Sequence, residues 1–180
     1  MPDYNKLTAL AEECGFTHSA PMDISTLEFM QEVRDMCNPG QCNRYGTSWS
    51  CPPECPPLEV LQEHVLGYSG GFLVQTVGEL EDSYDWEGIM DVGLTHKANF
   101  GRMWEELEKQ YSQVCAMGAG ACMLCESCTY PDESCRNPER MSASMEASGL
   151  LVNKVCTDNN LGYNYGQDKI AFTACFLVNE

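Results

Sequence analysis

The sequence predicts an α/β or α+β fold in a single domain, with a small sheet of three or four strands flanked by helices. Three observations support this prediction. Apolar residues recur at helical spacing in several segments, short β-branched and aromatic runs lie between them, and the twelve cysteines fall mainly into two groups. A chain of 180 residues is long enough to bury a core, so one cysteine-rich domain is expected over 1–180.

Helices are predicted where apolar residues line one face of a segment. Asp3 is placed to cap a first helix that ends near Gly15, and residues 25–28 read as a capping box in front of a second helix. The remaining helical patterns cover four segments: 57–66, which starts with prolines suited to a first turn, 94–111, a short segment that ends at Gly149, and 150–161.

Strands are predicted near residues 17, 72, 115 and 172. The clearest is 70–77, and 169–178 closes the chain as another. Residues 114–121 are small and apolar and read either as an edge strand or as a glycine-rich turn. The acidic segment 78–92 is expected to be a solvated connection. The order of the strands does not follow from the sequence.

The run C-M-L-C-E-S-C-T-Y-P-D-E-S-C, residues 122–135, carries the clearest chemical signal. Cys122, Cys125 and Cys128 have the two-residue spacing that lets a loop fold around an iron–sulfur cube, and Cys135 is the candidate fourth ligand. A single tetrahedral zinc is normally bound by two separated pairs, so a third cysteine at this spacing would be redundant. The spacing therefore favours a [4Fe-4S] cluster, with zinc as the alternative.

A disulfide framework explains this run less well, because cysteines three positions apart pair only with strain. The amino terminus has no signal-peptide pattern, and no apolar stretch reaches the roughly 18–20 residues that a membrane helix needs. We therefore expect a cytoplasmic protein whose cysteines stay reduced and bind metal.

A second group of cysteines lies in a loop of about 37–57, stiffened by prolines, while the first run belongs to a loop of about 115–140. The cysteine spacings in the 37–57 loop match no standard ferredoxin pattern, but four thiols within nineteen residues could form a second metal site. The aromatic residues Tyr45 and Trp49 read either as a shell that keeps water from a cluster or as ordinary packing. The candidate ligands of this second site are Cys37, Cys42, Cys51 and Cys55.

The formal net charge of −17 disfavours nucleic acid and membrane surfaces as partners. This negative charge either keeps the protein soluble or attracts a redox partner with a basic surface. Basic residues are scarce, so Arg136 and Arg140 stand out. They could pair with the negative charge of a cluster or of an anionic small molecule, or with a nearby carboxylate: Glu133, Glu139 or Glu146.

Four motifs occur together in a specific order: C-x-x-Y-G-x-x-W-x-C-P-P at 42–53, C-x-L-C-x-x-C-T-Y-P at 122–131, C-R-x-P-E at 135–139 and S-M-E-A-x-G at 144–149. In these motifs the chain resembles the cysteine-rich predicted metal-binding proteins of anaerobic bacteria and archaea. The resemblance implies metal binding, of an iron–sulfur kind, in an anaerobe. The family pattern places its first cysteine closer to Cys42 than Cys37 is, and Cys55 is an addition to it.

The chain contains no dinucleotide fingerprint, phosphate-binding loop, zinc-protease motif or serine-nucleophile motif. The function expected from the sequence is electron transfer by an iron–sulfur protein with one or two [4Fe-4S] clusters. Two alternatives stay open. One is a cluster-dependent enzyme with an open iron position, and the other is an interaction module stabilised by zinc.

Overall fold

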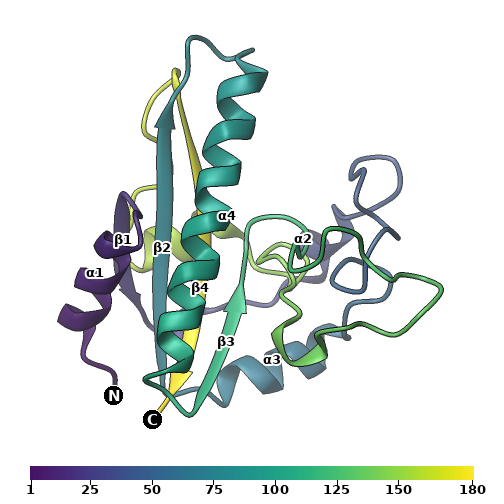
Figure 1. Cartoon of the computed structure of the whole chain (residues 1–180), viewed down its shortest axis with the longest axis horizontal. Coiled ribbons are helices and arrows are strands. Elements are labelled where there is room, and N and C mark those ends of the chain that lie inside the picture. Colours follow the sequence, from purple (N-terminus) through teal and green to yellow (C-terminus); the bar gives the residue numbers. More distant parts are fainter.

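The computed structural model describes residues 1–180 and is built around one antiparallel sheet (Figure 1). The strands lie in the order β1-β2-β4-β3, and each neighbouring pair is antiparallel. The fold is therefore α+β, one of the two predicted classes, and all four predicted strands are present. Their bounds are β1 His18–Met22, β2 Gly70–Glu79, β3 Gln113–Met117 and β4 Lys169–Asn179.

The long central strands β2 and β4 organise the core. They pair from Gly70 opposite Val178 to Glu79 opposite Lys169. Side chains alternate between the two faces of a strand, so the continuous apolar runs of these strands supply two separate cores. Phe72 of β2 belongs to one core and its neighbour Leu73 to the other.

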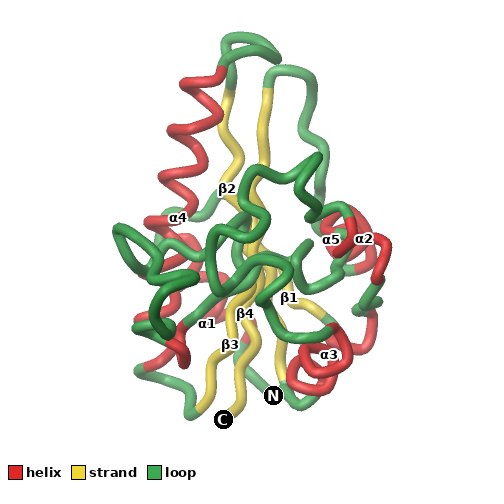
Figure 2. The backbone as a smooth tube through the Cα atoms, turned by 90° about the vertical axis from the view of Figure 1, so that its right-hand side faces the viewer, coloured by secondary structure: helices red, strands yellow, loops and turns green.

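Helices cover both faces of the sheet, as Figure 2 shows. On one face, α1 (Tyr4–Glu13) and α4 (Trp86–Glu108) bury side chains such as Leu7 and Met103. On the other face lie α2 (Gln31–Asp35), α3 (Leu58–Leu66) and α5 (Val152–Asp158). Two short 3-10 helices, η1 (Ile24–Thr26) and η2 (Pro138–Arg140), complete the elements. None of the helices has the length and apolar character required to cross a membrane.

The helix predicted to follow the capping box at 25–28 begins later in the chain than predicted. Asp23 caps the short η1 turn, because its carboxylate accepts from the backbone N–H of Ser25. Leu27 is then extended, and α2 begins only at Gln31. An aspartate two positions upstream has thus taken the capping role from Ser25.

Only residues 80–85 of the acidic segment 78–92 form the predicted connection. Strand β2 continues to Glu79, and α4 already begins at Trp86. Asp85 caps this helix by accepting a hydrogen bond from the backbone N–H of Gly88 at 2.9 Å. No side chain in the first turns of α4 is buried, so the apolar stripe that the periodicity detects covers only the later part of the helix.

The predicted short helix before Gly149 is replaced by η2 and a run of turns. Ser144 forms a parallel bridge with Gly118, just after β3, and Ser142 donates to the carbonyl of Ala116 at 3.0 Å. Gly149 has a φ of +76°, and a Cβ there would lie 2.9 Å from the carbonyl oxygen of Met30. These contacts fix the segment beneath the cysteine loops.

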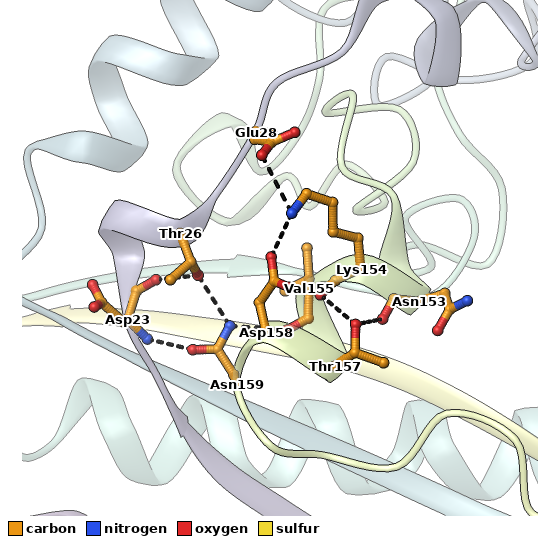
Figure 3. A network of polar contacts seen from close by, with 9 residues as sticks. All are labelled: Asp23, Thr26, Glu28, Asn153, Lys154, Val155, Thr157, Asp158 and Asn159. Atoms are coloured by element: carbon orange, nitrogen blue, oxygen red, sulfur yellow. Dashed lines mark hydrogen bonds and ion pairs between the residues drawn. The ribbon is translucent and has the colours of Figure 1, made fainter.

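A network of polar contacts around Asn159 attaches the end of α5 to the η1 turn (Figure 3). The amide oxygen of Asn159 accepts from the backbone N–H of Asp23 at 2.7 Å, and its amide nitrogen donates to Thr26 Oγ1 at 3.1 Å. Lys154 adds an ion pair with Glu28 at 3.2 Å. The network holds the start of the segment that leads to the 37–57 loop.

Candidate metal centre

The four cysteines of the 122–135 run line one small cavity of about 40 Å³. The segment 48–50 of the other cysteine loop lines the same cavity. Figure 1 shows the two loops next to each other on the side of the molecule opposite α1. The structure thus brings together all four residues that the spacing singled out: Cys122, Cys125, Cys128 and Cys135.

Hydrogen bonds within the 122–135 run fix its path around the cavity. Thr129 Oγ1 donates to the carbonyl of Ser134 at 3.0 Å, and the backbone N–H of Glu133 donates to the carbonyl of Thr129 at the same distance. Arg136 donates through Nη1 to the carbonyl of Ser127 at 2.8 Å. Arg136 therefore closes the loop between Cys128 and Cys135.

Three contacts join the two cysteine loops. Trp49 donates through Nε1 to the carbonyl of Glu133 at 3.1 Å, and its ring lies edge-on to Tyr130 at 5.1 Å between centroids. The backbone N–H of Cys122 donates to Ser50 Oγ at 3.0 Å. Trp49 lies on the cavity wall, as the shell interpretation required, whereas the half-buried Tyr45 does not line this cavity.

Asn137 is a neighbour of the thiols that the sequence analysis did not identify. Its Nδ2 donates to Cys125 Sγ at 3.4 Å, and the residue lines the cavity. Leu124 and Met141 contribute apolar wall. The position of Asn137 two residues after Cys135 is the only signal in the sequence that could have indicated this role.

The second cysteine group lies partly in the protein interior. Cys51 and Cys55 are buried, and Cys37 and Cys42 are half-buried. Cys37 packs against the small apolar cluster that contains Cys55. Burial, together with the negative charges of the other three thiolates and of Glu146, raises the pKa of Cys37 to about 11. Four thiols that repel as thiolates favour a positive ion among them.

Neither cysteine group forms a closed site for one ion. No three histidine, cysteine, aspartate or glutamate side chains are close enough together to hold a metal ion. Four thiolates on one zinc, each about 2.3 Å from it, would lie within ~4.6 Å of one another. A single bound water needs roughly 10–15 Å³, so the cavity at Cys122–Cys135 is larger than one ion requires. The thiol donors fit a soft metal.

The four remaining cysteines are core residues or lie beside the core. Cys14 caps the end of α1 and is buried, as predicted, and Cys156 and Cys175 are fully buried. Burial raises the pKa of Cys175, and it raises the pKa of Cys115 to about 11. Burial favours the protonated form of these four thiols, and none of them lines the cavity at Cys122–Cys135.

Arg140 does not contact the cysteines through its guanidinium. Its Nε lies 3.2 Å from Glu108 Oε1 of α4, and its guanidinium lies over the Trp104 ring at 5.3 Å. The carboxylate partner is thus Glu108, and none of the three glutamates considered from the sequence. Arg140 lines a neighbouring cavity of about 140 Å³ together with Cys122.

Comparison with known families gives one match. The model of a family described as "Predicted metal-binding protein (DUF2284)" matches residues 20–178. No curated protein and no solved structure matches the chain. The matched region includes both cysteine groups and nearly the whole sheet, so the resemblance drawn from the sequence motifs is confirmed.

Proposed function

Because the chain belongs to the DUF2284 family of predicted metal-binding proteins, we propose that the cysteines at 122–135 hold one [4Fe-4S] cluster and that the protein transfers electrons. The observation that carries this proposal is the shared cavity of Cys122, Cys125, Cys128 and Cys135. Such a cluster would supply one-electron redox chemistry.

The proposal of iron–sulfur over zinc has two supports. The ligand spacing is that of ferredoxin loops, and zinc sites normally use two separated pairs. The thiols also surround a cavity larger than one ion needs, without any three of them converging on a point. A single tetrahedral ion would require the loop to contract.

The residues around the cavity would set the properties of the centre. Asn137 donates to Cys125 Sγ, and hydrogen bonds to cluster sulfurs raise the reduction potential by stabilising negative charge. Trp49, Leu124 and Met141 limit the access of water. Arg136 holds the loop by its bond to Ser127 and carries positive charge on the same wall.

A second cluster at Cys37, Cys42, Cys51 and Cys55 is part of the proposal. Its support is the electrostatic proximity of the four thiols, together with Arg34, which donates to Cys55 Sγ at 2.7 Å. Arg34 supplies the only positive charge that contacts this group. Two clusters in adjacent loops would allow electrons to pass through the protein in two steps.

A basic redox protein is the proposed partner. The net charge of −17 favours encounter with a positively charged surface, and complementary charge speeds association. Cys128 is exposed, so the proposed centre lies near solvent on one side. We place this exchange in the cytoplasm of an anaerobe.

One observation favours a second candidate function, a cluster-dependent enzyme. A cavity of about 140 Å³ reaches Cys122 from the α4 side, so a small molecule there would lie beside a ligand of the proposed cluster. An iron position left open by one cysteine could then bind a substrate.

Serine substitution tests the two proposed cluster sites. Cys125→Ser is expected to lower iron and sulfide by about one cluster per chain, and Cys42→Ser to lower them by a second cluster. Cys156→Ser is the control, because this buried core thiol should leave the iron content unchanged. Equal iron and sulfide in Cys125→Ser and the unmodified protein would refute the first site.

A further inference from the structure

Two cations in this acidic chain have no oxygen partner. Of the ten lysine and arginine residues, eight pair with a carboxylate or donate to a carbonyl oxygen. The exceptions are Arg44, whose guanidinium makes no hydrogen bond or ion pair, and Lys97, which contacts only Met123 Sδ. Lys97 is half-buried, so its lack of an oxygen partner is unusual in a chain with 27 carboxylates, whereas Arg44 is exposed to solvent.

Arg44 and Lys97 line the same cavity of about 430 Å³. They are 53 positions apart in sequence, one in the 37–57 loop and the other on α4. Burial is the larger cause of the lowered pKa of Lys97, and the positive charge of Arg44 is the smaller one. The two charges are therefore close enough to interact. Like charges repel, so an anion between them would relieve an unfavourable arrangement.

The rest of the cavity wall is largely apolar. Leu94 and Met90 of α4 and Phe172 of β4 lie on it with several other apolar side chains. Its volume falls within the range of about 300–1,000 Å³ typical of small-molecule sites. An apolar wall with two convergent cations fits an organic anion better than an inorganic one, because the apolar part of the ligand would also be removed from water.

One carboxylate, Glu146, also lines this cavity. It forms no ion pair with either cation, and its charge acts on Cys37 and Tyr163, whose pKa values it helps to raise. The shift in Lys97 is caused by burial and Arg44 alone. Glu146 therefore limits the part of the cavity open to an anionic group but does not neutralise the pair of cations.

The cavity continues toward the candidate metal centre. The smaller cavity of about 140 Å³ shares Lys97, Met123 and residues 119–121 with it and reaches Cys122. Buried His96 lines this smaller space, and its Nε2 has no hydrogen-bond partner in the protein.

We propose that the cavity between α4 and the 37–57 loop binds a small organic carboxylate, with its anionic group between Lys97 and Arg44 and its apolar part against Phe172. The site adjoins the proposed cluster, but the inference does not depend on the metal. The ligand class follows from the two unpaired cations. The bound molecule would lie in the cavity next to the one that Cys122 lines.

Calorimetric titration with benzoate and with benzamide, its uncharged analogue, tests this inference. Benzoate is expected to bind more tightly than benzamide by about tenfold or more, because a charge-assisted hydrogen bond contributes about 1.5–3 kcal/mol. Lys97→Gln and Arg44→Gln are each expected to weaken benzoate binding by a similar factor and to leave benzamide unchanged. Lys97→Arg should retain most of the affinity, since it keeps the charge.

Lys109→Gln is the matched control, because Lys109 caps the same helix and is paired with Glu106. It should bind benzoate as the unmodified protein does. Iron and sulfide are measured in every sample, so loss of the metal and loss of the anion site are distinguished. Absence of benzoate binding at millimolar concentration, equal binding of benzamide, or full binding by Lys97→Gln would each overturn the inference.

Discussion

Arg34 and Cys55 are joined by two hydrogen bonds from one guanidinium. Arg34 Nη2 donates to Cys55 Sγ at 2.7 Å and to the Cys55 carbonyl at 2.8 Å, while Nη1 donates to the carbonyl of Pro56 at 2.6 Å. A residue of α2 thus fixes a buried thiol and the chain that enters α3. Burial raises the pKa of Cys55, and the positive charge of Arg34 opposes that rise.

Replacing Arg34 is therefore expected to impair the second cysteine group alone. Arg34→Gln should lower the free energy of unfolding by about 1–3 kcal/mol and reduce iron bound at Cys37–Cys55, because a buried acceptor loses its donor. Arg102→Gln is the control: Arg102 also donates to a carbonyl, that of Cys14, but far from the loops in sequence. An Arg34→Gln protein with unchanged iron content would show that Arg34 does not support metal binding.

Two glycines test how tightly the segment beneath the loops is fixed. Gly149→Ala should destabilise the protein by about 1–3 kcal/mol, because φ is +76° and a Cβ would meet the Met30 carbonyl. Gly101→Ala within α4 should be neutral or stabilising by up to about 1 kcal/mol, since a Cβ there meets nothing within 4 Å. Urea unfolding of both variants measures the contrast, and equal effects would contradict the described turn at Gly149.

Buried His96 should make the free energy of unfolding depend on pH. Burial, with a smaller effect of Lys97, lowers the pKa of His96 to about 4, so the folded protein holds the imidazole neutral. The unfolded chain takes up this proton near pH 6.5, and folding stability must therefore fall as the pH decreases from about 6.5 toward 4. The contribution should be absent above pH 7 and amount to about 2 kcal/mol at pH 5.

Unfolding measured at pH 7.5 and pH 5 in the unmodified protein and in His96→Gln isolates this effect. The variant cannot gain a proton at this position, so its loss of stability between the two pH values should be smaller. Carboxylates elsewhere act equally in both proteins and cancel in the comparison. An identical pH dependence in the two proteins would show that His96 is not held neutral.

The local signals in the sequence predicted most of the fold. Asp3, the prolines before α3 and the β-branched runs of β2 and β4 act within a few residues, and each predicted element is present there. The predictions failed where two local signals competed or where tertiary contacts decided. Asp23 displaced the capping box at Ser25, and the segment before Gly149 binds Gly118 and Ala116 instead of forming a helix.

The candidate centre, like the fold, has a part that the sequence predicted and a part that it did not. The ligand spacing of 122–135 is a local property, and the structure places those four thiols on one cavity. The contributions of Asn137 and Arg34 depend on side-chain direction, and the shared cavity of Arg44 and Lys97 depends on how a loop lies against α4. Such contacts between distant segments leave no spacing pattern in a single sequence.

The most direct measurement of the central claim is the metal and sulfide content of protein purified without oxygen. A [4Fe-4S] protein is expected to be brown, with a broad absorbance band near roughly 400 nm and about four irons and four sulfides for each cluster. Stoichiometric zinc without sulfide, in a protein that takes up no iron–sulfur cluster on anaerobic reconstitution, would contradict it.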